Sequence, residues 1–289
     1  MTLTEILKKA TQEHWAVGHF NISNMEQLHG IINAAKNLRA PVMIGLSEGE
    51  RDAFGLNQAV AVIESFKKET GLPIFVNSDH SKSPESAIKA FDAGFNSIHI
   101  DLSKLNYEEN VAGTKKVADY VHAKNPDISV EGELGYLVTD SSKIYKEAVE
   151  IPEESLTKPE QAVEFVKTTG VNRFAGAYGN LHGISLKTEK KLDLERIMAI
   201  REALPVEVAL VLHGGSGTND EMFKRAIEAG IANIHISTEI RIAYSEALRK
   251  AMADMPEETT PYKFFPSVIK AVQDKVEERL RLFGSVNRA

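Results

Sequence analysis

Residues 206–238 read VEVALVLHGGSGTNDEMFKRAIEAGIANIHIST and contain one complete strand–helix–strand alternation. Val206 to His213 is a short apolar run, as expected for a strand buried on both faces of a parallel sheet. Asp220 to Ala229 has helical spacing and stops before Gly230, and a second short strand follows at Asn233 to Thr238. This segment therefore predicts one β/α unit of a parallel sheet.

The same alternation runs along the whole chain. Helical patterns occur at Gln27 to Leu38, Glu85 to Ala93 and Gln161 to Lys167. Between them we predict six more strands: Ala16–Asn21, Val42–Ser47, Ile74–Asp79, Ser97–Asp101, Ser129–Glu133 and Phe174–Tyr178. Eight strands alternating with helices predict an α/β fold of the (β/α)8 TIM-barrel type, as a single domain over residues 1–289. An open doubly wound sheet would usually have fewer strands and a Gly-rich loop after the first one.

Two segments depart from the alternation. Residues 134–159 are polar and charged, and a connection of this length is typical of an active-site loop. Residues 256–289 are predicted to form a helical tail, with an amphipathic helix from Pro266 to Leu282.

The composition excludes several classes of function. The chain has 289 residues, of which 43% are hydrophobic and 26% charged, as in a soluble globular protein. A net charge of −7 argues against a nucleic-acid partner. With no cysteine, there is no disulfide, thiolate metal ligand or cysteine nucleophile. The N-terminal residues lack the pattern of a signal peptide, and no apolar run is long enough for a bilayer, so we expect a cytoplasmic protein without a membrane partner.

Polar side chains stand at the carboxyl ends of nearly all the predicted strands, where barrel enzymes carry their chemistry. These residues are Asn21, Ser47, Asp79 with His80, Asp101, Glu133, His182 just past the sixth strand, His213, and Ser237 with Thr238. We therefore expect an active site at this rim of the barrel.

Three of these rim residues are histidines from separate strands. A single histidine is more often a surface or hydrogen-bonded residue, and we interpret His14, His29 and His122 in this way. The fold brings His80, His182 and His213 together, however, and three imidazoles with an open fourth position are typical of catalytic zinc. The sequence thus predicts a zinc site.

The rim carboxylates have two interpretations each. Asp79 is a candidate general acid/base beside the metal, or a residue that orients a metal-bound imidazole. Asp101 and Glu133 can bind a second cation, hydrogen-bond the histidines, or form salt bridges within the rim. The Gly-rich segment after His213, with hydroxyls from Ser237 and Thr238, is a candidate phosphate site, because the loops after strands seven and eight often bind phosphate in barrels.

Together these motifs resemble the class II (metal-dependent) fructose-bisphosphate and tagatose-bisphosphate aldolases over nearly the whole chain. The resemblance is carried by AVGHFN (16–21), SDH (78–80), IDLS (100–103), VEGELG (130–135), GNLHG (179–183) and VLHGGSG (211–217). The motifs of residues 78–80, 179–183 and 211–217, in this order, are highly specific.

The resemblance implies reversible cleavage of fructose 1,6-bisphosphate to dihydroxyacetone phosphate and glyceraldehyde 3-phosphate through a zinc-stabilised enediolate. His80, His182 and His213 would bind Zn²⁺, Asp101 and Glu133 match positions that can hold a second metal, and a monovalent cation is also compatible. Asp79 would exchange the proton on the hydroxyl at the cleaved bond. The residues implied around the phosphorylated sugar are Asn21, Ser47, Gly183, Lys187, Gly214, Ser216, His235, Ser237 and Thr238. A homodimer or homotetramer is expected.

The sequence departs from the family pattern in places. His235 stands where the family usually has an asparagine, and the long loop lacks the expected Gly-rich stretch and acidic pair. The base that takes the substrate carbon proton is therefore left open among Asp140, Glu147 and Glu150. Arg51 is a candidate to meet the distal phosphate.

Three alternatives follow. One is the same chemistry on tagatose 1,6-bisphosphate or another ketose phosphate, since such epimers differ in one hydroxyl. Another is a metal-dependent hydrolase, although the first strand offers His19-Phe20-Asn21 rather than a His-x-His pair. The last is a phosphosugar-binding protein without activity, against which Asp79 and the three histidines argue.

Overall fold

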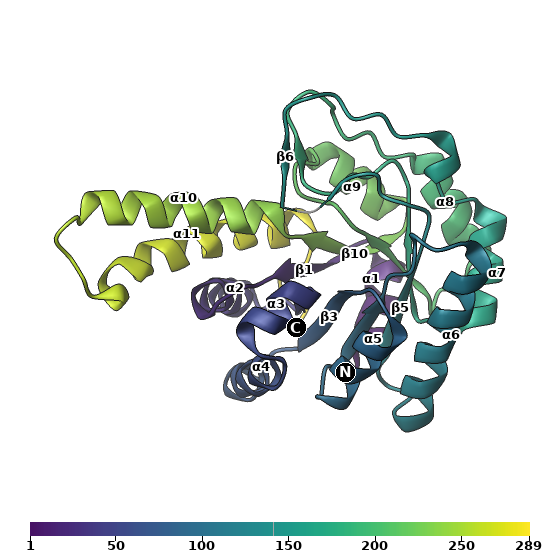
Figure 1. Cartoon of the computed structure of the whole chain (residues 1–289), viewed down its shortest axis with the longest axis horizontal. Helices are drawn as coiled ribbons and strands as arrows, with labels where there is room; N and C mark the ends of the chain where they lie inside the picture. Colours follow the sequence, from purple (N-terminus) through teal and green to yellow (C-terminus); the bar gives the residue numbers. More distant parts are fainter. Residues whose placement is uncertain (141) are drawn as a thin grey trace.

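Eight parallel strands close into a barrel in the order β1-β10-β9-β7-β5-β4-β3-β2, as the computed structural model of residues 1–140 and 142–289 shows (Figure 1). The barrel strands are β1 (Val17–Asn21), β2 (Val42–Leu46), β3 (Ile74–Ser81), β4 (Ser97–Ile100), β5 (Ser129–Leu134), β7 (Arg173–Gly176), β9 (Ala209–Leu212) and β10 (Ile231–Ile236). The predicted (β/α)8 barrel is confirmed. Ser141, in the predicted long loop, lies outside the described residues.

Two predicted strands are shorter than expected. The sixth is β7, which ends at Gly176 rather than Tyr178, and the seventh is β9, which begins at Ala209 rather than Val206. Before β9 the chain makes a turn, in which the Val208 amide donates to the Pro205 carbonyl at 3.0 Å. This turn occupies the residues that the apolar pattern assigned to the strand.

Helices surround the barrel, and local sequence sets their ends. They are α1 (Leu3–Glu13), α2 (Met25–Leu38), α3 (Glu48–Phe54), α4 (Leu56–Thr70), α5 (Pro84–Asp92), α6 (Tyr107–Lys124), α7 (Pro159–Thr169), α8 (Leu194–Ala203), α9 (Asp220–Glu228), α10 (Thr238–Asp254) and α11 (Pro261–Leu282). Asn24, Ser83 and Asn219 each cap a helix by accepting a backbone N–H with the side-chain oxygen. None of the helices in the described part of the chain combines the length and apolar character needed to cross a bilayer.

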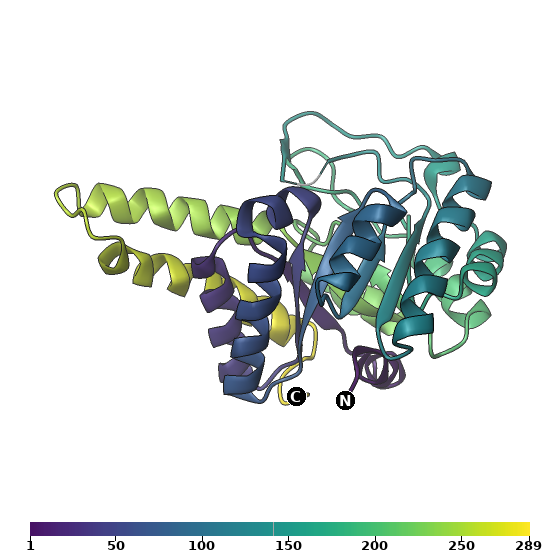
Figure 2. The same cartoon turned by 60° about the horizontal axis from the view of Figure 1, so that its bottom comes forward.

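The last two helices form a hairpin that projects from the barrel (Figures 1 and 2). The terminal helix starts at Pro261, five residues before the predicted start, so Pro266 lies inside it. Proline there removes only one backbone hydrogen bond near the helix start. The middle of α11 packs on α2, where a Cβ on Gly30 would come within 2.7 Å of Val272.

The long segment after β5 starts at the carboxyl-end rim of the barrel, where Tyr136, Leu137, Thr139 and Asp140 line a pocket. It carries the short strand β6 (Ile144–Tyr145), which pairs with β8 (Ile184–Ser185) from the connection after β7, and the 3-10 turn η1 (Glu153–Ser155). The amide of Ile184 donates to the Lys143 carbonyl at 2.9 Å. This small sheet fixes the segment beside the loop that contains His182.

Candidate active site

A pocket of about 330 Å³ opens at the carboxyl ends of the barrel strands. Its lining includes fourteen of the fifteen residues predicted for the site: Asn21, Ser47, Asp79, His80, Asp101, Glu133, His182, Gly183, His213, Gly214, Ser216, His235, Ser237 and Thr238. Lys187 is not among the lining residues, because its exposed ammonium group pairs with Glu147 at 2.7 Å. The structure therefore places the predicted rim residues together and Lys187 apart from them.

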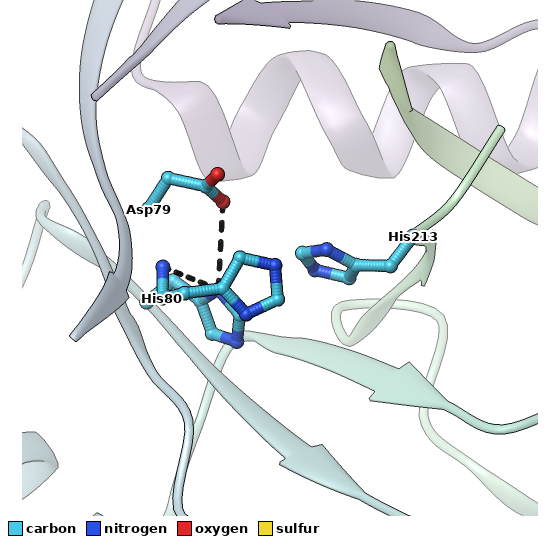
Figure 3. Close-up of side chains that lie close together, drawn as sticks. Asp79, His80 and His213 are labelled. Carbon is cyan, nitrogen blue, oxygen red and sulfur yellow. Dashed lines mark hydrogen bonds and ion pairs between the residues drawn. The ribbon is translucent and has the colours of Figure 1, made fainter. Parts of the chain in front are cut away.

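The three predicted zinc ligands converge at the base of this pocket. The ring centroid of His80 lies 4.6 Å from that of His213 and 5.1 Å from that of His182. The rings of His182 and His213 are 6.0 Å apart. Figure 3 shows Asp79, His80 and His213 turned toward one another from β3 and from the end of β9.

A bulge at the end of β3 aims two successive side chains into the pocket. Ser78 pairs with Ile98 and Ser81 with Ile100, so three steps on β3 face two on β4. His80, inside the bulge, has a φ of 46°, a left-handed conformation that is costly for a residue other than glycine. In a regular strand, neighbours face opposite sides. The bulge explains why both Asp79 and His80 line the pocket.

His80 is held by a rim carboxylate. Its Nδ1 donates to Asp101 Oδ2 at 2.7 Å and lies 3.7 Å from Glu133, which leaves Nε2 available to a cation. Desolvation alone would raise the pKa of Asp101, but the hydrogen bond and charge of His80 outweigh it and lower that pKa. Lys82 also pairs with Asp101.

His213 is oriented by a carboxylate that the sequence analysis did not single out. Its Nε2 lies 2.6 Å from Glu131 Oε1 and must donate, because an ionised carboxylate only accepts. Desolvation would raise the pKa of Glu131, but the charges of His99 and Arg173 hold it well below its usual value. The ring of His213 therefore presents Nδ1 as its lone-pair nitrogen, as a metal ligand with an orienting carboxylate does.

Arg173 anchors Glu131 from within the barrel. Both side chains are fully buried and their Nη1 and Oε2 atoms are 2.8 Å apart. The guanidinium also donates to four polar side chains at 2.5–3.2 Å: Ser129, Asn233, Asn77 and Ser97. Barrel interiors are usually packed with branched apolar residues, so this layer of the core is unusually polar.

The strand period could have revealed these hidden residues. Successive residues of a strand alternate between faces, so positions two before a rim residue share its face. His19, His99 and Glu131 each lie two residues before Asn21, Asp101 and Glu133, and all three are buried. His99 lies 3.3 Å from Glu133 Oε2 and 3.6 Å from Asp79 Oδ1.

Asp79 is an ionised carboxylate with fixed orientation. Asn21 Nδ2 donates to its Oδ2 at 3.0 Å, and His235 Nδ1 lies 3.4 Å from its Oδ1. Desolvation opposes ionisation, but the charge of His80 and the nearby imidazoles of His235 and His99 lower the pKa of Asp79 well below its usual value. Such a carboxylate can accept a proton from a substrate hydroxyl at neutral pH.

His235 stacks on a second buried imidazole. The rings of His19 and His235 are 3.6 Å apart and nearly parallel, at 9°. Burial lowers the pKa of His19 to about 4, so this ring is neutral at pH 7. Burial and the neighbouring imidazoles also lower the pKa of His235 well below 6.5. His235, which stands where the family usually has an asparagine, is thus a neutral imidazole that faces Asp79.

Another part of the pocket lining suits a phosphate group. Gly183 and Gly214 have φ angles of 72° and 65°, and a Cβ on Gly214 would come within 2.2 Å of the Leu181 carbonyl. Ser237 and Thr238 stand at the N-terminus of α10, where free backbone N–H groups and the helix dipole favour an anion. Ser237 Oγ is buried and has no hydrogen-bond partner among the described residues.

The donor atoms present suit a divalent cation. Asp79, His80, His99 and His213 offer ligand atoms within 4.8 Å of one another, as do His80, Asp101 and Glu133. Asp79 Oδ1, Glu133 Oε2 and His99 Nε2 are buried without a hydrogen-bond partner in the described chain, a cost that a bound cation would remove. His182 is in neither of these groups of donor atoms. Burial and the charges of His80 and His213 lower the pKa of His182 well below its usual value, so this ring is neutral and keeps a lone pair.

The candidates for the carbon base and for the distal phosphate contact differ in whether they line the pocket. Asp140 lines the pocket with its carboxylate paired to Lys143 at 2.7 Å, whereas Glu147 and Glu150 do not line it. Arg51 does not face the main pocket, because it donates to Ser81 and Ser86 and lines a separate small cavity beside α5.

Comparison with known proteins matches the resemblance seen in the sequence. The family described as "Fructose-bisphosphate aldolase class-II" matches residues 1–288. A probable fructose-bisphosphate aldolase of Bacillus subtilis is 35% identical over 292 residues, covering 100% of this chain and 99% of the relative. A sulfofructosephosphate aldolase of Alkalicoccus urumqiensis is 35% identical over 284 residues, covering 98% and 96%.

Solved structures give the same result for the fold. The crystal structure of the YdjI aldolase from Escherichia coli K12 superposes with a TM-score of 0.83 at 32% identity, over 98% of this chain and 97% of the other. A putative fructose-1,6-bisphosphate aldolase from Coccidioides immitis gives a TM-score of 0.86 at 30% identity, over 99% and 96%.

Proposed function

The chain belongs to the class II fructose-bisphosphate aldolase family, and from this premise we propose that it cleaves fructose 1,6-bisphosphate reversibly to dihydroxyacetone phosphate and glyceraldehyde 3-phosphate. It is an aldolase, that is, a carbon–carbon lyase. The observation that carries the substrate proposal is one pocket that joins a cluster of three imidazoles, an ionised Asp79 and a helix N-terminus. The hydrolase and the inactive binding-protein alternatives are set aside, because the relatives are named as aldolases.

We propose His80, His182 and His213 as the residues that hold Zn²⁺, with Asp101 and Glu133 available to a second cation. A divalent cation there supplies Lewis-acid stabilisation of the negative charge that develops on the ketose oxygens. Asp101 and Glu131 fix the tautomers of His80 and His213, so that each ring presents one defined nitrogen.

The chain's own residues perform the proton transfer. Asp79, ionised and held by Asn21, takes the hydroxyl proton at the carbon–carbon bond being cleaved and returns it in the condensation direction. Gly183, Gly214, Ser216, Ser237 and Thr238 bind the phosphate next to the ketone. We keep Asp140 as the candidate for the substrate carbon proton, since it alone among the three acidic residues considered lines the pocket.

The outer end of the pocket binds the second charged group of the substrate. Lys82 and Lys104 line this pocket, and Lys82 is already paired with Asp101. We propose that Lys104, whose ammonium lies 5.7 Å from the centre of the Tyr136 ring, meets the distal phosphate. A sulfonate there would make the same ion pair, and one relative acts on a sulfofructose phosphate by name.

The test measures triose phosphate formed by the purified protein from fructose 1,6-bisphosphate, tagatose 1,6-bisphosphate and a sulfofructose phosphate. We expect turnover that a chelator abolishes and Zn²⁺ restores. The ratio of kcat/KM values decides which ketose is preferred. Undiminished turnover after complete metal removal would refute the role of the histidine cluster. We also propose, from the sequence, a cytoplasmic homodimer or homotetramer, which analytical ultracentrifugation and fractionation would test.

A further inference from the structure

Lys190 is a buried lysine whose ammonium group is enclosed by backbone oxygens. The side chain lies in the connection between β8 and α8, and the residue is 3% exposed. Nζ lies 2.5–2.8 Å from the carbonyl oxygens of Leu181, Gly183, Gly214 and Ser216, which share the three hydrogens of the ammonium group. No carboxylate forms an ion pair with it in the described chain, so the direct partners of the ammonium group are backbone carbonyls.

The four oxygens belong to the two loops that form the site. Leu181 and Gly183 flank His182, and Gly214 and Ser216 follow His213. Gly183, Gly214 and Ser216 also line the pocket, whereas Lys190 does not. The positive charge therefore lies directly behind the wall on which the substrate phosphate is proposed to bind.

A cage of backbone carbonyls is how proteins replace the water shell of an alkali cation. Four carbonyl dipoles that converge without a cation would repel one another and remain unsatisfied in a buried place. Burial lowers the pKa of Lys190 to about 7, and the charge of Glu239 opposes this shift. A neutral amine has two hydrogens and a lone pair that would repel the carbonyl oxygens, whereas the ammonium offers three hydrogens and no lone pair, so the cage favours the ammonium form.

We propose that Lys190 is a built-in monovalent cation that clamps the loops after β7 and β9 and so positions His182, His213 and the phosphate wall. It is a positioning residue, since it does not reach the pocket. The inference rests on the proposed function only for the roles of the two loops. It implies that the wild-type protein needs no added potassium or ammonium ion, and that removing the side chain creates a site for one.

The test compares Lys190→Ala, which leaves room for a cation, with Lys190→Met, which fills the space without charge; Lys191→Ala on the exposed neighbour is the matched control. Thermal unfolding is measured in a tetraalkylammonium buffer with increasing KCl or NH₄Cl, a readout that does not depend on the identity of the ketose. We expect Lys190→Ala to melt lower than wild type and to regain its melting temperature in a saturable way as potassium is added. The wild type, Lys190→Met and Lys191→Ala should not respond.

Activity is the second readout. We expect both Lys190 variants to lose about 100-fold in kcat/KM, as for loss of hydrogen bonds to a charged group, and only Lys190→Ala to regain it with potassium. If the wild-type protein does not cleave fructose 1,6-bisphosphate, the proposed function is refuted, but the melting experiment can still be interpreted. The inference would be overturned if Lys190→Ala had the same melting temperature as wild type and that temperature did not change with monovalent cations. Borohydride trapping of substrate on Lys190 would overturn it as well, because the ammonium would then be a nucleophile.

Discussion

Replacing Arg173 by methionine should cost the barrel a large part of its stability. Methionine has similar length but cannot donate, so Glu131 would lose its buried partner at 2.8 Å. The guanidinium hydrogen bonds now accepted by the side-chain oxygens of four residues would also be lost: Asn77, Ser97, Ser129 and Asn233. No water reaches this layer readily, since Arg173 and Glu131 are fully buried.

The magnitude follows from the burial of the pair. Removing one partner of a buried ion pair leaves an uncompensated charge and costs about 3–5 kcal/mol. Glu131 would keep its contact with His213, which limits the loss to this range. Because a folded domain has about 5–15 kcal/mol in total, the variant should fold but melt about 10 °C lower.

Urea unfolding of the metal-free protein measures this loss without a contribution from metal binding. Trp15, the single tryptophan and 1% exposed, reports unfolding by fluorescence, and circular dichroism checks that both probes coincide. Arg225→Met, on the exposed face of α9, is the control and should change stability by less than about 0.5 kcal/mol. A double-mutant cycle with Glu131→Gln isolates the interaction energy between Arg173 and Glu131. A free energy of unfolding of Arg173→Met within about 1 kcal/mol of the wild-type value would refute this estimate.

Four further changes probe the site. His80→Ala should abolish both bound zinc and turnover. The control is His122→Ala, which should leave both intact, because the ring of His122 contacts Asn172 outside the pocket. Zinc retained by His80→Ala would contradict the assignment of His80 as a ligand. Asp79→Asn should keep the metal but lose about 100- to 10,000-fold in kcat, and a retained rate removes Asp79 from the mechanism. Lys187→Ala should change kcat/KM by less than about twofold, since its ammonium pairs with Glu147 at the surface; a larger loss would place it at the substrate. His19, with a pKa lowered from 6.5 to about 4, contributes stability that is present above pH 6.5 and lost as the pH falls toward 4, about 3 kcal/mol in all. His19→Asn should flatten the urea-unfolding profile over that range, and an unchanged slope would show that His19 does not titrate there.

The hydrophobic period and the strand ends determined the fold and the rim of the site. Short apolar runs alternating with helices leave a closed parallel barrel as the simplest solution, and the carboxyl ends of its strands meet at one rim. Asp79, His80 and His213 could therefore be brought together from the sequence alone. Element boundaries were less accurate, because the turn before β9 and the early start of α11 depend on local hydrogen bonds that periodicity does not report.

Only the tertiary structure revealed what supports these residues. Arg173 and Glu131 pair across adjacent strands, and Lys190 reaches carbonyls of two loops up to 26 residues away along the chain. Such contacts depend on register, on the β3 bulge that turns His80 and on backbone directions, none of which leaves a pattern in a single sequence. The barrel and its reactive rim can be predicted from the amino-acid sequence, because both follow from periodicity along a strand. Which buried charge neutralises which is known only from the folded structure, because it depends on distances between atoms far apart in the chain.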